Sequence, residues 1–200
     1  MNIEKIISGV QSALGVDIDG RAGPATWAAI YGRIVSTNAL PDEITAAPAD
    51  DRSEKNIATL MPSVQPFARA LVLKAAQNGI EIKIISGRRS YEEQDALFAQ
   101  GRTATGDVVT HAQAGYSNHN FGIAFDIGVF EGKRYLTESP KYKAVGSLGR
   151  ELGLEWGGNW KTIKDEPHFQ LRPTWAAQLN EHDMLAQLRD RVAHDEQIFA

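Results

Sequence analysis

The chain has 200 residues, of which 42% are hydrophobic and 23% charged. This composition is typical of a soluble globular protein and excludes disorder throughout. Its 21 Lys and Arg against 25 Asp and Glu give a net charge of -4, and no basic run is long enough to follow a phosphate backbone, so we expect no nucleic-acid partner. Cysteine is absent, which excludes a disulfide framework and restricts any zinc site to nitrogen and oxygen ligands.

The first predicted element is an amphipathic helix in the N-terminal part of the chain. Its apolar residues recur at helical spacing and polar residues interrupt any continuous apolar core, so the segment predicts neither a signal peptide nor a membrane span. These apolar positions are Ile3, Ile6, Ile7, Val10 and Leu14. A turn cluster then leads to Pro24, which suits the first position of a second helix that runs to about Ile34. We therefore expect a small helical hairpin over residues 1–35.

The region after this hairpin is predicted to hold a linker, a second domain and a final helix. Residues 36–55 are assigned to the linker, because Pro, Ala and Asp predominate there without apolar periodicity. We expect the second domain over residues 56–172 and a C-terminal helix over residues 173–200. The elements predicted along the way are helices 62–78, 91–100 and 140–153, strands 80–86, 117–126 and 168–171, and a polar helix from Thr174 onward. This mixture favours an α+β fold, in which helices flank a small antiparallel sheet.

The segment SNHNFGIAFD, residues 117–126, carries two potential metal ligands, His119 and Asp126. On a strand, small residues share one face with Asp126, and bulky apolar residues share the other. A face of small residues around a carboxylate is typical of a cleft floor, where a ligand approaches the backbone. His119 precedes the alternating residues, which begin at Gly122, and a turn there could direct its imidazole towards Asp126.

A second polar cluster lies downstream, around the predicted strand 168–171. His168 and Gln170 are expected to face the same way on this strand, while Phe169 enters the core. Pro167 bends the chain just before the strand, so Asp165 can curl back onto the side of His168.

His119, Asp126 and His168 together supply three nitrogen and oxygen ligands and leave one tetrahedral position open. An open position is the arrangement of a catalytic zinc rather than of a structural one. The fold we expect is therefore a small sheet with flanking helices around a zinc cleft. The other histidines are assigned to ordinary hydrogen-bonded positions, and they are His111, His182 and His194.

The spacing of these residues resembles a motif of bacterial cell-wall zinc peptidases, the superfamily of D-alanyl-D-alanine carboxypeptidases and L-alanyl-D-glutamate endopeptidases. The matching positions are Ser117, His119, Gly122, Ala124 and Asp126, followed by Asp165 and His168. The resemblance covers about residues 57–172. It includes SGRRSYEEQ at 86–94 and WGGNW at 156–160, which are most similar to the phage endolysin branch, whose members cut between L-Ala and D-Glu of the peptide stem.

The resemblance implies a peptidoglycan endopeptidase that uses one Zn2+ ion. Asp165 would act as the general base on water and then protonate the leaving amine, with Glu166 as the alternative. Arg89 would stabilise the oxyanion or hold a substrate carboxylate. Arg88 stands where the family usually has an aromatic residue, so the choice between the two arginines stays open.

Other positions receive supporting roles from the same resemblance. Outer-shell or substrate contacts are assigned to Ser117, Gln94 and Gln170. Trp156 and Trp160 are either core residues or a wall of the substrate groove. Between them, Asn159 replaces an aspartate that is common in the family.

Two other functions share much of this sequence pattern. A D-Ala-D-Ala carboxypeptidase would use the same ligands, and a non-catalytic wall-binding protein would hold a structural zinc. The carboxylate of Asp165 favours catalysis, because a binding protein has no need of it beside an open zinc position. In the N-terminal segment, residues 10–26 resemble half of a small peptidoglycan-binding module with the pattern Asp-Gly-x-x-Gly-Pro-x-Thr, so this hairpin either binds the wall or is only structural.

The expected setting follows from the endolysin resemblance. The protein would be made in the cytoplasm without a signal peptide and would act on the cell wall after release, for which a holin-like pore is a candidate. Its expected partner is the stem peptide of peptidoglycan, and we expect a monomer. Either phage lysis or a release process of the host would fit this setting.

Overall fold

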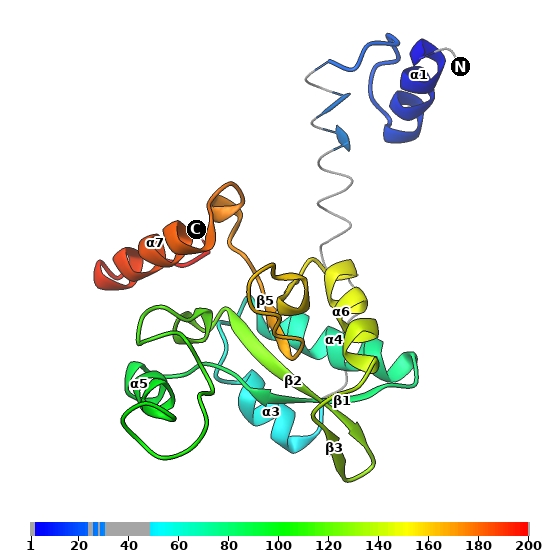
Figure 1. Ribbon diagram of the computed structural model, residues 1–200. Coiled ribbons are helices and arrows are strands. Elements are labelled where there is room, and N and C mark those ends of the chain that lie inside the picture. Colours follow the sequence, from blue (N-terminus) through cyan, green and yellow to red (C-terminus); the bar gives the residue numbers. More distant parts are fainter. Residues whose placement is uncertain (1–2, 24–25, 28, 31–48, 200) are drawn as a thin grey trace. The chain divides into compact units, whose positions relative to one another are not determined.

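The computed structural model describes residues 3–23, 26–27, 29–30 and 49–199. The chain divides into two compact units, Met1–Asp42 and Glu43–Ala200. Figure 1 shows the helices and strands of both. In the part of the chain that is described, no helix combines the length and the apolar character needed to cross a membrane.

The smaller unit contains the predicted N-terminal helix, α1, which spans Ile3–Leu14. Its buried residue Gln11 holds the loop that follows: the side-chain NH2 donates to Asp19 Oδ1 at 2.7 Å and to Thr26 Oγ1 at 2.9 Å, and the Oε1 accepts from Gly20 N at 2.9 Å. A single buried amide thus fixes the turn cluster. The backbone is helical at residues 26–27 and 29–30, whereas the predicted start at Pro24 and the predicted last turn at residues 31–34 lie outside the described residues.

The larger unit begins with helix α3, Asp51–Ile57, in which Asp50 caps the N-terminus. Ser53 is buried and its Oγ accepts from the backbone N of Ile84 at 2.9 Å. The linker predicted for residues 36–55 therefore ends before Asp51, and residues 36–48 lie outside the described part of the chain. Composition was misleading here, because the polar residues of α3 bind the edge of the sheet instead of solvent.

The sheet has the strand order β1-β2-β5-β4, with β3 beside β2. Every pairing is antiparallel. The strands are β1 (Glu81–Ser86), β2 (Ala124–Glu131), β3 (Arg134–Leu136), β4 (Glu155–Trp156) and β5 (His168–Gln170). In Figure 1, β1 and β2 run side by side through the centre of this unit. The predicted α+β fold with a small antiparallel sheet is confirmed.

Four longer helices follow α3 in the described part of this unit. They are α4 (Gln65–Gln77), α5 (Tyr91–Ala99), α6 (Lys141–Glu151) and α7 (Glu181–Ala193). Helices α3 and α4 pack against β1, and α6 packs against α4 and β4. The helices predicted at 62–78, 91–100 and 140–153 are confirmed with slightly shorter bounds, and α5 begins with a capping box formed by Ser90 and Glu93.

Two predicted elements differ from the structure. Residues 118–121 form a 3-10 helix, η1 (Asn118–Phe121), rather than the start of a strand. Gly122 follows with φ +67, a left-handed conformation that ends η1 and that glycine adopts without strain. The helix predicted from Thr174 onward is split into a 3-10 helix, η3 (Thr174–Ala176), and α7, because Asn180 caps a new N-terminus by accepting from Asp183 N.

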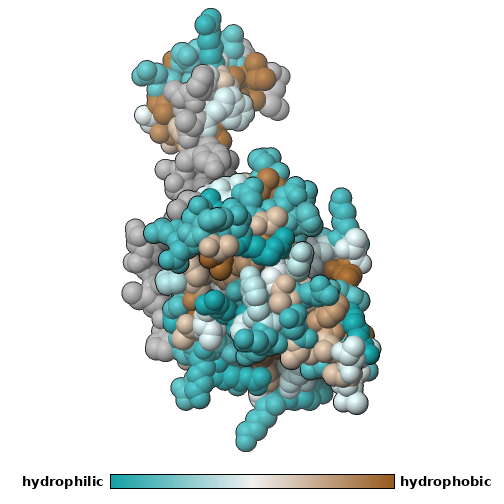
Figure 2. All heavy atoms as spheres, turned by 90° about the vertical axis from the view of Figure 1, so that its left-hand side faces the viewer, coloured by the Kyte–Doolittle hydropathy of each residue, from teal (hydrophilic) through white to brown (hydrophobic). Residues whose placement is uncertain are grey.

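The core lies on the apolar face of the sheet, where Phe125 and Phe169 are opposite each other in the register and stack at 5.9 Å. Glycines of α6 let that helix approach closely. A Cβ on Gly146 would lie 2.4 Å from the ring of Trp156. A second cluster joins η1 to α7, and its buried members are Phe121, Ile123, Ala176, Met184, Leu185, Leu188 and Ile198. The face drawn in Figure 2 is largely hydrophilic, with its apolar residues in separate patches.

Gly146→Ala is expected to destabilise the protein by about 1–3 kcal/mol, because the added methyl group overlaps Trp156. Helix propensity alone would act in the opposite direction by about 1 kcal/mol, so any loss of stability reports the steric contact. Urea unfolding followed by circular dichroism measures it. Lys143→Ala, on the exposed face of the same helix, is the control and should leave the free energy of unfolding nearly unchanged.

Candidate metal centre

Three side chains converge at one end of the sheet: His119 from η1, Asp126 from β2 and His168 from β5. Asp126 and His168 are opposite each other in the antiparallel register, so their side chains share one face. His119 Nε2 lies 3.2 Å from Asp126 Oδ1, and His168 Nδ1 lies 3.3 Å from the same oxygen. The two imidazole nitrogens are 3.3 Å apart. One nitrogen or oxygen atom of each of these three residues therefore lies close enough to the other two for all three to bind the same ion.

The outer nitrogen of each imidazole meets an oxygen that can only accept a hydrogen bond. His119 Nδ1 lies 2.7 Å from the carbonyl oxygen of Gly87, and His168 Nε2 lies 2.9 Å from Gln170 Oε1. With an ion at the centre, each ring would therefore carry its proton on the outer nitrogen and turn a lone pair inward. Two inward lone pairs and one carboxylate oxygen are the donor set that a divalent cation requires, and this set suits zinc best.

Asp126 is ionised at this centre, and although burial alone would lower the pKa of the His168 imidazole, the hydrogen bond to Asp126 raises it. Burial alone would raise the pKa of Asp126, but the imidazoles of His119 and His168 outweigh burial and hold the pKa of this carboxyl well below its usual range. Its side chain keeps 19% of its surface exposed, whereas that of His119 keeps 2%. The group is thus closed on the protein side and open on the side of Asp126.

Asp165 reaches the same site through a glycine loop. The carbonyl oxygen of Gly157 accepts from the backbone N of Asp165 at 3.1 Å, and Asp165 O accepts from His168 N at 3.2 Å. A Cβ on Gly157 would lie 2.5 Å from Asp165 O, so only glycine permits this approach. The predicted return of Asp165 to the side of His168 is therefore made by a turn that rests on the WGGNW segment.

The electrostatics of Asp165 place its carboxyl among the site groups. Burial, and then the charge of Asp126, raise the pKa of Asp165, while His168, His119 and Arg89 act in the opposite direction. A cation bound at the centre would lower this pKa.

Glu166, the alternative to Asp165, takes part in different contacts. Its carbonyl oxygen accepts from Trp156 Nε1 at 2.8 Å, and its charge acts on Tyr142. Burial is the main cause that raises the pKa of Tyr142 to about 12, and Tyr135 and Glu166 add to this effect. Asp165 is thus the member of this pair whose charge couples to the three potential ligands.

The two arginines of the SGRRS segment point to different surroundings. Arg89 Nη2 lies 3.4 Å from Asp126 Oδ2, and Arg89 Nη1 donates to Gln94 Oε1 at 3.0 Å. Gln94 is fully buried and its NH2 donates to the carbonyl oxygen of Ala112 at 2.7 Å, which fixes the amide oxygen towards Arg89. Arg88 is exposed. Arg89 is therefore held at the site by a buried amide, and Arg88 is not.

The remaining predicted site residues occupy the outer side of the centre. Gln170 is fully buried beside His168. Ser117 precedes η1, where its side chain makes no capping hydrogen bond and its carbonyl oxygen accepts from Asn120 N at 3.0 Å. The three histidines assigned to ordinary positions are all exposed, and they are His111, His182 and His194. Among the described residues, the group of His119, Asp126 and His168 is the one set of three or more ligand side chains close enough to share an ion.

Asn120 has a role at the site that the sequence did not reveal. Its Nδ2 donates to the carbonyl oxygens of Arg89 and Ser90 at 3.2 and 3.3 Å, so it holds the backbone of the site arginine. The available signal was the run of polar residues around His119, since asparagines that become buried need hydrogen-bond partners. Of the two tryptophans with an open assignment, Trp160 has its ring 4.8 Å from that of His168 and covers one side of the centre.

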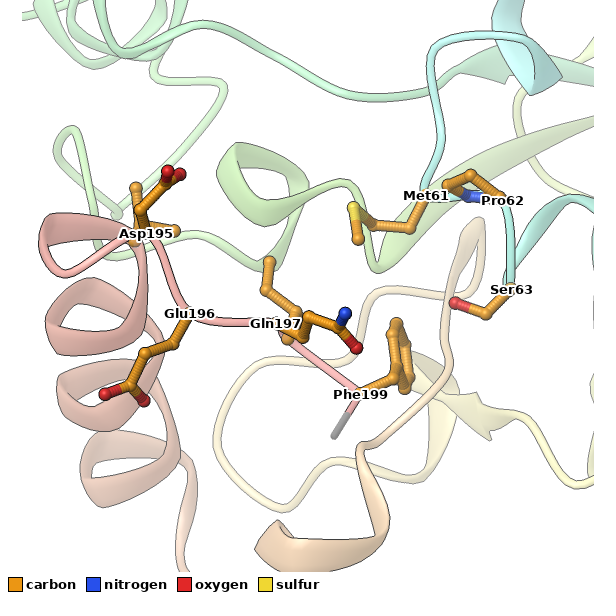
Figure 3. Close-up of a pocket in the computed structure, with 9 residues that line it drawn as sticks. Met61, Pro62, Ser63, Asp195, Glu196, Gln197 and Phe199 are labelled. Carbon is orange, nitrogen blue, oxygen red and sulfur yellow. The ribbon is translucent and has the colours of Figure 1, made fainter.

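A separate pocket lies away from this centre. Figure 3 shows it between the segment after α3 and the chain that follows α7, with Met61 and Phe199 pointing into it. It encloses about 450 Å³ and is lined by Met61, Pro62, Ser63, Val192, Asp195, Glu196, Gln197, Ile198 and Phe199. None of the candidate ligands lines it, so cavity size does not mark the metal centre.

Several known proteins are similar to this chain. The sequence profile of a family described as D-alanyl-D-alanine carboxypeptidase matches residues 110–171. The peptidoglycan L-alanyl-D-glutamate endopeptidase CwlK of Bacillus subtilis (strain 168) is 39% identical over 124 residues, 57% of this chain and 74% of that protein. The L-alanyl-D-glutamate peptidase of Listeria phage A118 is 32% identical over 122 residues, 60% of this chain and 40% of that protein. The crystal structure of the Serratia marcescens L-Ala D-Glu endopeptidase ChiX has a TM-score of 0.45 and 24% identity, over 65% of this chain and 93% of that chain.

Asp126→Asn is expected to weaken zinc binding by more than about 100-fold, a loss larger than that from an outer contact, because it removes the carboxylate between the two imidazoles. Calorimetric titration of zinc into the metal-free protein measures the affinity. His111→Ala, at an exposed histidine, should bind zinc as the wild type does. Unchanged affinity of the Asp126→Asn protein would place the ion elsewhere.

Proposed function

Because this chain belongs to the peptidase M15 family of metallopeptidases, we propose that it is a zinc-dependent endopeptidase that hydrolyses the bond between L-Ala and D-Glu in the peptide stem of peptidoglycan. The activities for which the Bacillus and Listeria phage relatives are named support this choice of bond. The observation that carries the proposal is the open group of His119, Asp126 and His168 with Asp165 beside it.

In this proposal, His119, Asp126 and His168 hold one Zn2+ ion. When bound, zinc supplies Lewis acidity and makes water a stronger nucleophile at neutral pH. Asp165 takes the proton from the attacking water and then delivers it to the nitrogen of D-Glu as the peptide bond breaks. Burial of Asp165 supports this role, because a carboxyl with a raised pKa holds a proton more readily than an exposed one.

Arg89 is proposed to act on the substrate from the other side of Asp126. Its guanidinium can donate to the carbonyl oxygen that gains negative charge, or to a carboxylate of the stem peptide. The hydrogen bond from Arg89 to Gln94 supports either role, since it reduces the number of conformations that the arginine must lose on binding. Trp160 is proposed to form a wall of the substrate groove.

The N-terminal unit is proposed to bind the wall, and residues 56–172 to be the peptidase domain. Two apolar side chains of that unit support wall contact: Ile18 is 61% exposed and Trp27 is 59% exposed. We also propose that the chain acts as a monomer and reaches the wall through a holin-like pore, either as a phage endolysin or as a host protein descended from one. The phage relative supports this setting.

Mass spectrometry of the soluble products from purified sacculi tests the proposed activity. Stem peptides that begin with D-Glu should be released by the wild-type protein, and a chelator should abolish their release. Release of D-alanine alone would instead identify a carboxypeptidase, the activity named for the matching family. Binding to sacculi without any released product would identify a wall-binding protein.

Asp165→Asn should reduce kcat by about 10²–10⁴-fold, the usual contribution of a general base, while zinc affinity stays near that of the wild type. Glu166→Gln is the matched neighbour and should retain most of the activity. The rates are measured on a soluble stem peptide with both proteins loaded with zinc. If Glu166→Gln lost the activity and Asp165→Asn kept it, the roles of the two acids would be exchanged.

Arg89→Lys is expected to lower kcat/KM by about tenfold to a hundredfold, because an ammonium cannot reproduce the forked donors of a guanidinium. Arg88→Lys changes the adjacent exposed arginine and should have almost no effect. Equal losses in the two variants would show that only positive charge near the cleft is needed. The same stem-peptide assay compares them.

A further inference from the structure

A closed set of hydrogen bonds lies behind His168, on the side away from Asp126. Its members come from η1, from β4, from β5 and the chain just after it, and from the first residue of α7. We name it the polar ring, and it consists of Asn118, Glu155, Gln170, Arg172 and Glu181. Gln170 is fully buried and Asn118 is 5% exposed, so the inner half of the ring is shielded from water.

Arg172 links the two carboxylates of the ring. Its Nε donates to Glu155 Oε1 at 2.5 Å, and its Nη2 donates to Glu181 Oε2 at 2.7 Å. The two amides close the circuit on the inner side. Gln170 Nε2 donates to Glu155 Oε2 at 2.7 Å, and Asn118 Nδ2 donates to Gln170 Oε1 at 2.6 Å. Asn118 Nδ2 also donates to Glu181 Oε1.

The chemistry of these groups allows one orientation of the amides. An arginine only donates and a carboxylate only accepts, so Glu155 and Glu181 both require N–H groups from the inner side. Gln170 must therefore turn its NH2 to Glu155 and its oxygen to Asn118 and His168. In the observed orientation, Asn118 Oδ1 is buried and has no hydrogen-bond partner among the described residues. A flipped Asn118 would place this oxygen against the oxygens of Glu181 and Gln170 and would lose both hydrogen bonds.

We propose that the polar ring orients His168 for metal binding. Gln170 Oε1 lies 2.9 Å from His168 Nε2 and can only accept, so it holds the N–H of Nε2 and leaves Nδ1, on the side of Asp126 and His119, as the nitrogen that would bind an ion. Glu155, Arg172 and Glu181 are thus positioning residues, which act on the centre through the orientation of Gln170. The inference rests on the proposed metal site and is independent of which peptide bond is cut.

The same contacts make α7 part of the centre. Glu181 is the first residue of this helix, and Arg172 Nη1 also lies 3.2 Å from Met184 Sδ. The C-terminal helix, which the sequence places after the peptidase domain, therefore supplies one of the two carboxylates that orient Gln170.

Glu155→Gln tests the ring with almost no change of volume. The new amide must give its oxygen to Arg172 and thus presents NH2 to Gln170, which favours a flipped Gln170 whose NH2 faces His168 Nε2. 1H–15N spectra of the zinc-loaded protein detect the imidazole Nε2–H of His168, which exchanges slowly with water while Gln170 Oε1 accepts it. We expect this signal to be lost or shifted and zinc affinity to fall by about 10- to 100-fold.

The double variant Glu155→Gln with Gln170→Glu exchanges the two groups and keeps the same net charge. In it, the carboxylate introduced at position 170 accepts from His168, from Asn118 and from the amide introduced at position 155. The oxygen of that amide accepts from Arg172, so every donor again meets an acceptor. Recovery of the Nε2–H signal and of zinc affinity is expected. Glu151→Gln changes an exposed carboxylate on α6 that pairs with Lys74 and should match the wild type in both measurements.

Two outcomes would overturn the proposal. The first is a Glu155→Gln protein that keeps the Nε2–H signal and zinc affinity of the wild type. The second is a double variant that recovers neither property although its circular dichroism spectrum and unfolding midpoint match those of the wild type. Because both readouts are recorded without substrate, a failure of the proposed peptidase activity would leave them intact and is distinguished from a failure of the ring.

Discussion

The candidate centre depends on one cross-strand pair, Asp126 on β2 and His168 on β5. Directly opposed residues of antiparallel strands point to the same face, with Cβ atoms about 4.5–5.5 Å apart, so the register alone brings carboxylate and imidazole together. One turn of 3-10 helix before β2 adds His119. A slip of one residue would place Asp126 on the apolar face beside Phe169. The packing of that face and the assembly of the ligands are therefore parts of the same folding event.

Much of this could be predicted from the sequence, because the signals are local. Alternation along β2 separates the side of Asp126 from the side of Phe125, and both kinds of residue fall where the period of two requires. Capping residues such as Ser90 and Asn78 delimit helices at the expected places. The convergence of His119 with the other two ligands also followed from its place just before the strand.

The parts that could not be predicted depend on contacts between distant residues. The hydrogen bond between Asn118 and Glu181 joins residues 63 positions apart, and no local pattern distinguishes a glutamate of the polar ring from one in solvent. Helix α3 was mistaken for linker for a related reason, since Ser53 is polar in composition but buried in the fold. Local spacing thus identifies the ligands, whereas their orientation is determined by polar groups that the tertiary fold collects.

The position of the ring in the sequence has a consequence for the order of synthesis. Ribosomes extend chains from the N-terminus, so β1, His119 and Asp126 emerge well before β5, and Glu181 emerges after all of them. A nascent chain can pair β1 with β2 while it still lacks the second imidazole, and the orientation of Gln170 is settled only when the first turn of α7 is free. Any hydrolytic capacity therefore arises late in translation, and a fragment that stops before Glu181 would lack the contacts that orient His168.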